Sequence, residues 1–240
     1  MITSKDNPTL KLVRALQRKK EREETGLFAC EGEDLCDAAV AAGIEPVELL
    51  VRAGAGCLPC SFGRHPATVS VEAELLAGVS TLPYPPRAIG VFRRDDLPGG
   101  AREACLALWQ VSDPGNVGTL IRSADAFGAA VALSEGCADP LSQKALRASA
   151  GAIFRVPLVP WNARPGRQIG LDARGAVPLT GVDLTPPVTI VLGAERAGLP
   201  SELLEACDMV VAIPMPGDAE SLNVAAAGAI ALYELSRRAS

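Results

Sequence analysis

Apolar positions follow a helical period at the start of the chain and form short continuous runs in its second half. Over residues 9–24, Leu10, Val13 and Leu16 keep approximate helical spacing after the turn signal Asn7-Pro8. This pattern predicts one amphipathic helix over 9–24.

The elements that follow are short, up to a segment rich in proline and glycine over 82–100. They comprise an apolar run at 27–30, a helix over 32–42 and strands at 47–51 and 68–71, with 88–92 as a candidate last strand. The change in composition predicts a boundary between a small N-terminal α/β domain, residues 1–98, and a second domain, residues 101–240.

Strands and helices alternate after residue 100. The predicted strands are 106–111, 130–133, 156–159, 188–192 and 209–213, and the predicted helices are 117–127, 142–150, 201–207 and 221–237. Continuous apolar strands that alternate with helices indicate a parallel sheet covered on both faces. The last helix is apolar on every side, which predicts that it is partly buried against another subunit.

Composition narrows the class of protein. The 240 residues are 48% hydrophobic and 21% charged, which excludes an intrinsically disordered chain. The longest apolar stretches are far shorter than the ~20 residues of a membrane span, and no signal segment opens the chain, so we expect a soluble, cytoplasmic protein. Seven scattered cysteines are expected to be reduced thiols.

Metal and histidine chemistry are not expected. Cys57 and Cys60 form one CxxC pair, but no second CxxC or histidine pair completes a tetrahedral zinc site, and loop packing is the favoured explanation. His65 is the only histidine and lies in a stretch rich in glycine and proline, so neither a histidine-centred triad nor a multi-histidine metal site is expected. We expect no metal ligands.

Charge is unevenly distributed. The net charge of −5 argues against binding nucleic acid through bulk positive charge, but residues 1–22 hold seven lysines and arginines. A basic first helix can neutralise phosphates and release counterions, although a solvated helix face gives the same pattern. The candidate RNA-binding residues are Lys11, Arg14, Arg18, Lys19 and Lys20.

Three segments after predicted strands hold the candidate chemistry, because ligands of parallel sheets gather at the carboxyl ends of the strands. In the first, Arg122 stands one turn after Gly118, over the predicted helix start, where free backbone N–H groups favour a phosphate. The second runs from Gly193 through Glu195 to Gly198, and the third contains Ser221, which can cap the last helix. A surface arginine, a charged turn and a helix cap without chemistry are the alternatives.

The spacing of these segments excludes two cofactor motifs. Gly115 and Gly118 do not fit a GxGxxG dinucleotide fingerprint, and no Gly-Lys-Ser/Thr of a Walker A loop occurs. Instead, the three segments together resemble the SpoU or TrmH-type family of SPOUT RNA methyltransferases. The matching motifs are Asn116-x-Gly118-x-x-x-Arg122, Gly193-x-Glu195-x-x-Gly198, and Ile213-Pro214-Met215 with Ser221-Leu222-Asn223. More loosely, residues 4–32 resemble the small RNA-binding domain that many members carry.

The resemblance implies a parallel sheet with a C-terminal trefoil knot, a homodimer, and S-adenosylmethionine as the methyl donor. Its cofactor-binding residues would be Gly193, Ile213, Met215 and Leu222. Its catalytic neighbourhood would be Asn116, Arg122, Glu195, Ser221 and Asn223, with Arg122 reaching a pocket of the partner subunit.

The implied reaction is methylation of a ribose 2′-hydroxyl in RNA, by analogy ribosomal rather than transfer RNA, without metal. A guanidinium keeps its proton above pH ~12, so we assign Arg122 to a phosphate and the developing alkoxide. Ser221, a phosphate oxygen or water would take the proton. The alternatives are a noncatalytic RNA-binding or ribosome-assembly factor and, less favoured, a nucleotide-dependent oxidoreductase.

Overall fold

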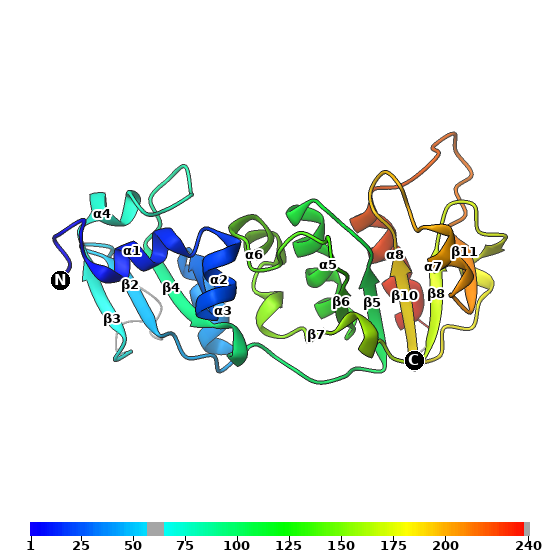
Figure 1. Cartoon of the computed structure of the whole chain (residues 1–240), viewed down its shortest axis with the longest axis horizontal. Coiled ribbons are helices and arrows are strands. Elements are labelled where there is room, and N and C mark those ends of the chain that lie inside the picture. Colours follow the sequence, from blue (N-terminus) through cyan, green and yellow to red (C-terminus); the bar gives the residue numbers. More distant parts are fainter. Residues whose placement is uncertain (57–64, 238–240) are drawn as a thin grey trace. The chain divides into compact units, whose positions relative to one another are not determined.

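A computed structural model of the chain describes residues 1–56 and 65–237 and resolves two compact units (Figure 1). Unit 1 comprises Met1–Leu97 and Leu141–Phe154, and unit 2 comprises Pro98–Pro140 and Arg155–Ser240. The sequence placed 141–154 in the second domain, but these residues pack with the first unit. Within the described residues, no helix is long and apolar enough to cross a membrane.

Unit 1 is built on a four-stranded sheet of order β1-β4-β2-β3. Its strands are β1 (Leu27–Glu31), β2 (Glu48–Arg52), β3 (Thr68–Val71) and β4 (Ala88–Arg93). Strand β4 pairs antiparallel with β1 and β2, and β2 pairs parallel with β3. The predicted strand at 88–92 is thus an interior strand of this sheet.

The helical pattern at the N-terminus forms two helices, so the prediction of one helix over 9–24 is wrong. Helix α1 (Pro8–Ala15) ends before Leu16, and α2 (Lys19–Thr25) follows it. The break is held by two side-chain hydrogen bonds: the Gln17 side chain donates to the Val79 carbonyl at 2.8 Å, and Arg22 donates to the Leu16 carbonyl at 2.6 Å. Val79 lies outside the segment, and both donors are polar side chains, so the spacing of apolar positions could not reveal the break.

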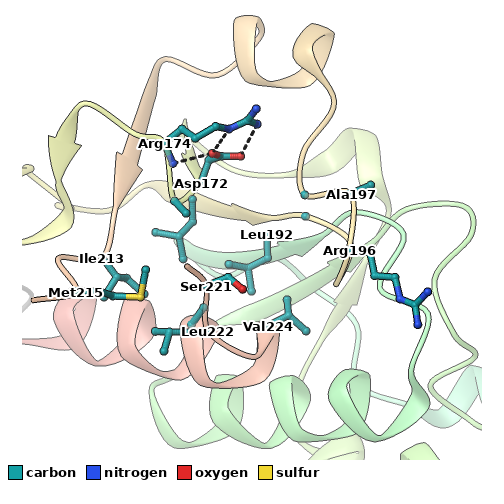
Figure 2. Close-up of a pocket in the computed structure, with 15 residues that line it drawn as sticks. Asp172, Arg174, Leu192, Arg196, Ala197, Ile213, Met215, Ser221, Leu222 and Val224 are labelled. Carbon is teal, nitrogen blue, oxygen red and sulfur yellow. Dashed lines mark hydrogen bonds and ion pairs between the residues drawn. The ribbon is translucent and has the colours of Figure 1, made fainter. Parts of the chain in front are cut away.

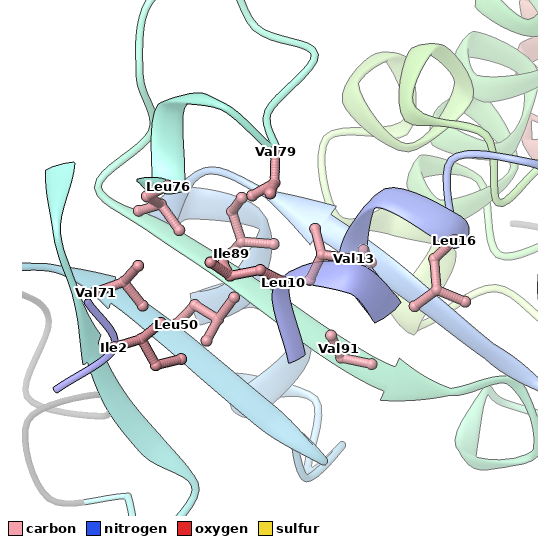
Figure 3. Packing of buried hydrophobic residues seen from close by; sticks show 11 residues of the cluster. Ile2, Leu10, Val13, Leu16, Leu50, Val71, Leu76, Val79, Ile89 and Val91 are labelled. Carbon is pink, nitrogen blue, oxygen red and sulfur yellow. The ribbon is translucent and has the colours of Figure 1, made fainter. Parts of the chain in front are cut away.

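Both faces of the unit 1 sheet are covered. On one face, α1 and α4 (Ala73–Ala77) contribute to an apolar cluster with strand residues (Figure 3). On the other face lie α3 (Glu33–Ala41), α6 (Gln143–Ser149) and η2 (Ala152–Phe154). Phe154 stacks on Phe28 and contacts Phe92 with ring centroids 6.4 and 5.9 Å apart, and this contact fixes 141–154 in unit 1.

Unit 2 is a seven-stranded sheet of order β7-β6-β5-β10-β8-β11-β9, and every pairing in it is parallel, as predicted. Its strands are β5 (Ala104–Leu108), β6 (Ala130–Leu133), β7 (Leu158–Val159), β8 (Arg167–Leu171), β9 (Val177–Pro178), β10 (Val188–Leu192) and β11 (Met209–Ala212). Strands β8 and β9 were not predicted. Strand β5 begins and ends earlier than the predicted 106–111.

Helices cover both faces of this sheet. On one face α5 (Pro114–Ala126) packs against α8 (Val224–Ser236), and on the other α7 (Ser201–Glu205) and two tryptophans cover alanines and a cysteine of β5 and β6. Gly228 lets the two long helices approach, because a Cβ at this position would lie 2.3 Å from Leu120 and 2.8 Å from Leu192. A larger residue here would require the Leu120 and Leu192 side chains to shift.

Two helix starts differ from the sequence prediction, and both differences bear on the site. Helix α5 begins at Pro114, capped by Asp113, whose carboxylate accepts from the Asn116 N–H at 3.0 Å. Helix α8 begins at Val224, and its cap is Asn223 rather than Ser221. The Asn223 side chain accepts from the backbone of Ala225 at 2.8 Å.

Candidate active site

The loops that contain the predicted site residues lie together at the carboxyl end of the unit 2 sheet. Because all its strands are parallel, the loops after β5, β10 and β11 leave the sheet at this same end, and the loop after β8 lies there too. Residues after β8, β10 and β11 and at the start of α8 line a cavity of about 390 Å³ (Figure 2). This volume is within the range of sites for small molecules and cofactors. The loop after β5 contributes no lining residue but is hydrogen-bonded to Glu195 of the loop after β10.

All four residues predicted to bind the cofactor line this cavity. They are Gly193 from the loop after β10, Ile213 and Met215 after β11, and Leu222 before α8. Leu192 and Val224 extend the apolar wall. Leu222 is 38% exposed, so the cavity offers an unfilled apolar surface to a ligand.

The loop after β10 is a tight backbone hairpin. Ala194 and Gly198 exchange two N–H···O bonds of 3.1 and 3.0 Å, and Gly198 has φ +67°. A Cβ on Gly193 would lie 2.2 Å from the Gly198 carbonyl carbon and 2.4 Å from the Leu199 nitrogen. Only glycine therefore fits at 193, and the hairpin holds its tip residues in a fixed position.

Glu195, at that tip, joins the loop after β10 to the loop after β5. Its carboxylate accepts from the backbone N–H groups of Ser112 and Asp113 at 3.1 and 3.0 Å and from Asn116 Nδ2 at 3.1 Å. Burial alone would raise the pKa of Glu195, but these donors outweigh burial and the pKa is lowered. A carboxylate held ionised by its donors is a poor proton acceptor, so Glu195 orients the loop.

Asn116 and Asn223 extend this network to the third loop. Asn116 donates to Glu195 and accepts from Asn223 Nδ2 at 3.2 Å. Asn223 also caps α8 through its Oδ1 atom. One chain of hydrogen bonds thus ties together residues from three loops that are far apart in sequence.

Ser221 and Arg122 differ from this network in having no partner within the described part of the chain. Ser221 lines the cavity and its hydroxyl makes no hydrogen bond there. Arg122 is exposed, is absent from the cavity lining, and has no ion pair among residues 1–56 and 65–237. Its side chain is therefore free to bind a ligand or another subunit.

The predicted position of Arg122 over a helix start is wrong. Helix α5 begins at Pro114, so Arg122 lies eight residues further on, about 12 Å along the axis at 1.5 Å per residue. The unpaired N–H groups of the first turn cannot assist it at that distance. The start of α5 therefore contributes nothing to an anion bound by Arg122.

Sequence reasoning missed the part of the cavity wall that follows β8. Asp172 and Arg174 line the cavity and form a bidentate pair, with Nε–Oδ1 and Nη2–Oδ2 distances of 2.9 and 3.1 Å. Arg196, next to Glu195, also lines it. Asp172 and Arg174 belong to a polar Asp-Ala-Arg-Gly turn directly after β8. This turn can be identified as part of the site only if β8 is first predicted as a strand of the sheet.

The candidate RNA-binding residues lie in unit 1, on exposed turns of α1 and α2, and most are paired. The pairs are Lys11–Asp6, Arg18–Glu21, Lys19–Glu23 and Lys20–Glu24, with N–O distances between 2.8 and 3.7 Å. Arg14 is exposed, and the described residues hold no ion-pair partner for it. The local positive potential is therefore lower than the count of cations implies.

The cysteines and acidic side chains among the described residues bear on two further kinds of chemistry, metal binding and thiol reactivity. Within the part of the chain that the structure describes, no group of three His, Cys, Asp or Glu side chains is placed to hold a metal. Cys57 and Cys60 lie outside the described residues. Burial raises the pKa of Cys36 to about 12 and that of Cys105 to about 11, so these thiols stay protonated at neutral pH.

Comparison with known families identifies similarity over both units. The SpoU rRNA Methylase family matches residues 103–233, and the MRM3-like substrate binding domain matches residues 7–90. The chain is 31% identical to the 23S rRNA (guanosine(2553)-2′-O)-methyltransferase RlmP of Bacillus subtilis, over 98% of each chain.

Solved structures agree with this similarity. An AdoMet-bound rRNA methyltransferase from Sinorhizobium meliloti superposes with a TM-score of 0.84 at 31% identity, covering 98% of this chain and 97% of that one. The SpoU methyltransferase AviRb from Streptomyces viridochromogenes, in complex with AdoMet, also gives a TM-score of 0.84, at 28% identity and with 97% and 98% covered.

Proposed function

We propose, starting from the fact that the chain belongs to the SpoU rRNA methylase family, that its substrate is a ribose 2′-hydroxyl of 23S ribosomal RNA. The chain is an S-adenosylmethionine-dependent RNA 2′-O-methyltransferase. The observation that carries the proposal is the cavity lined by the second and third motif segments, with the network from Glu195 to Asn223 that ties Asn116 of the first segment to them. The full-length relative that acts on 23S rRNA supports the choice of RNA.

The cavity fits the methyl donor. Its apolar wall of Leu192, Ile213 and Leu222 suits a nucleoside ring, and the missing Cβ of Gly193 brings backbone groups to its surface. When bound, S-adenosylmethionine supplies a methyl group on a sulfonium that is already activated for transfer. The chain itself has to hold and align the ribose hydroxyl and to assist loss of its proton.

The residues beside the cavity divide this work. The Glu195–Asn116–Asn223 chain fixes the loops, and we assign Arg122 to a substrate phosphate and to the developing alkoxide. Ser221, whose hydroxyl is free within the described residues, is placed at the cavity to relay the proton. No step in this scheme requires a metal ion.

Arg122 lies outside the cavity of its own chain, so we propose that it completes the site of a second subunit. The exposed stripe of α8 supports a homodimer: Ala226, Ile230 and Tyr233 share one helical face, and the last two are 41% and 54% exposed. Phe127, just after α5, contacts Tyr233 with ring centroids 6.2 Å apart. This apolar face and Arg122 belong to the same pair of packed helices.

Mixed dimers test this arrangement. Arg122→Ala and a cavity variant, Leu222→Asp, at a lining residue that is 38% exposed and so tolerates replacement without unfolding, should each be nearly inactive alone. In a mixture, heterodimers would contain one cavity and one arginine that are both intact, and random pairing should restore about a quarter of wild-type activity. No recovery would place Arg122 at its own subunit's site or outside catalysis.

The activity itself is tested by transfer of a labelled methyl group from S-adenosylmethionine to 23S rRNA from cells that lack the gene. The expected product is one 2′-O-methylated nucleoside after complete digestion. Label on a base, or in transfer RNA alone, would contradict the proposal. The noncatalytic alternative predicts no label, and calorimetric titration with the donor separates it further, since a binding module need show no heat.

We place most phosphate contacts outside the cavity on the basic residues of α1 and α2, Lys11, Arg14, Arg18, Lys19 and Lys20. The match of residues 7–90 to a substrate-binding domain supports this assignment. Their ion pairs are exposed, so phosphates can replace the carboxylates at little cost.

A further inference from the structure

The cavity lining contains three charged side chains, and two of them neutralise each other. Asp172 and Arg174 form the bidentate pair described above, and the Asp172 carboxylate also accepts from the Arg174 backbone N–H at 2.9 Å. This pair leaves Arg196 as the one unbalanced charge in the lining as described.

Arg196 combines a fixed backbone with a free guanidinium. It occupies the tip of the Ala194–Gly198 hairpin, directly after Glu195, whose carboxylate is held by donors from the loop after β5. The side chain is exposed and makes no ion pair or hydrogen bond within residues 1–56 and 65–237. Five unsatisfied donors are thus presented from a rigid position.

The direction of the side chain identifies what it can reach. Figure 2 shows the Arg196 guanidinium pointing away from the Asp172–Arg174 pair and away from Ile213, Met215 and Leu222 at the apolar end of the cavity. Arg196 therefore lies at the opening of the cavity with its side chain directed outward. From there it can contact a substrate that approaches the cavity, rather than a ligand bound inside it.

We propose that Arg196 binds a phosphodiester that flanks the methylated ribose and so positions the 2′-hydroxyl at the cavity. The proposal rests on the function proposed above and adds a positioning residue on the second loop. A planar guanidinium binds a phosphate bidentately, which fixes orientation as well as distance. In a chain of net charge −5, such a contact has to be local.

The phosphate is favoured over the carboxylate of the methyl donor. A donor held along the apolar wall lies on the side from which the Arg196 guanidinium points away. A phosphodiester next to the target ribose approaches from the mouth, because the ribose has to arrive there to meet the methyl group.

The test compares Arg196→Gln with Arg196→Lys and with a control, Arg167→Gln. Arg167 begins β8, at the end of the strand away from the cavity, and its side chain is 42% exposed. Its substitution removes one positive charge from unit 2, as Arg196→Gln does. Two measurements use an in vitro transcript of 23S rRNA: steady-state methyl transfer, and binding by fluorescence anisotropy at several salt concentrations. Donor affinity is measured by calorimetry.

For Arg196→Gln we expect the KM for RNA to rise about tenfold and the salt slope of binding to fall by about one. The affinity for S-adenosylmethionine should stay within twofold of wild type. Arg196→Lys should keep the wild-type salt slope, and its KM for RNA should lie between those of wild type and Arg196→Gln, because lysine keeps the charge but lacks the planar fork. The control should match wild type.

Two results would overturn the proposal. A weakened donor affinity with unchanged KM for RNA would assign Arg196 to the donor's carboxylate, and no change in either would assign it no ligand. If wild type binds the transcript but transfers no methyl group, the proposed function fails, while the salt slope still decides whether Arg196 contacts a phosphate.

Discussion

The two units hold their charged side chains in different ways. In unit 1 four exposed cations of α1, α2 and the turn between them pair with a carboxylate close by in sequence: Lys11, Arg18, Lys19 and Lys20. In unit 2 the polar groups beside the cavity join loops 79 and 107 residues apart in sequence. Local pairs make an adaptable surface, whereas long-range bonds at the edge of a parallel sheet make a site with fixed geometry.

The largest loss of stability and of donor binding is expected at Gly193, where the loop after β10 has no room for a side chain. Gly193→Ala would place a Cβ 2.2 Å from the backbone of Gly198, and the hairpin would have to open. We expect a loss of at least about 3 kcal/mol in the free energy of unfolding of unit 2, and no measurable donor binding. Denaturant unfolding and calorimetry measure both. Gly217→Ala, which meets nothing within 4 Å, is the matched control.

The next largest effect separates chemistry from stability. Arg122→Lys should lower kcat by about 10²-fold, since the ammonium keeps the charge but loses the planar fork. Its Tm should stay near that of wild type, because Arg122 is exposed and has no partner in the described part of the chain. Single-turnover methyl transfer and thermal unfolding give the two values. Near-normal turnover would contradict the assigned role.

A smaller effect tests the network itself and carries a pH dependence. Because the pKa of Glu195 is lowered in the fold, its ionised form stabilises fully above the unfolded value of about 4.3, and this contribution is lost as pH falls through the lower folded value. Glu195→Gln should cost about 1 kcal/mol at pH 7 and about tenfold in kcat.

The difference in Tm between Glu195→Gln and wild type should therefore shrink as the pH is lowered below about 4. Glu202→Gln, in the short helix α7, serves as the control because Glu202 is exposed. A difference in Tm that is constant with pH would show that the loss comes from packing and not from the ionised carboxylate.

The smallest effect is expected in unit 1. Charge reversal at Arg18, Lys19 and Lys20 should weaken RNA binding severalfold and reduce its salt dependence, while folding changes little because exposed pairs contribute about 0.2–1 kcal/mol each. Arg14→Glu should weaken RNA binding more than Lys20→Glu. Of these two residues, Lys20 has an ion pair within the described part of the chain, and it has to give up this pair to bind a phosphate, whereas Arg14 does not. Unchanged affinity and salt slope in the triple variant would remove α1 and α2 from the RNA interface.

Secondary structure was predicted most accurately where one continuous run of apolar side chains forms the whole strand. Strands β6 and β10 were located with their observed bounds, because continuous apolar residues mark a strand buried on both faces. Strand β8 was missed because Arg167 and Gln168 open it and Gly170 interrupts it, although Ile169 is fully buried. The trefoil knot stays a prediction from the resemblance.

The site was predictable in part for a related reason. The four residues predicted to bind the cofactor line the cavity, because motif spacing identified their loops. Asp172 and Arg174 were out of reach once β8 was missed. The bond between Glu195 and Asn116 depends on the pairing of β5 with β10, which no local pattern encodes. The cap at Asn223 is local, but Ser221 and Asn223 are both good N-cap residues, and the sequence did not decide between them.

The contact at Gly228 has a consequence for assembly. A Cβ at this position would displace the ends of the Leu120 and Leu192 side chains, which lie between α8 and its neighbours. Arg122 and the exposed ring of Tyr233 are carried by α5 and α8, the same pair of packed helices. In the homodimer proposed above, a change in the packing at Gly228 would therefore alter both the subunit interface and the position of the Arg122 guanidinium.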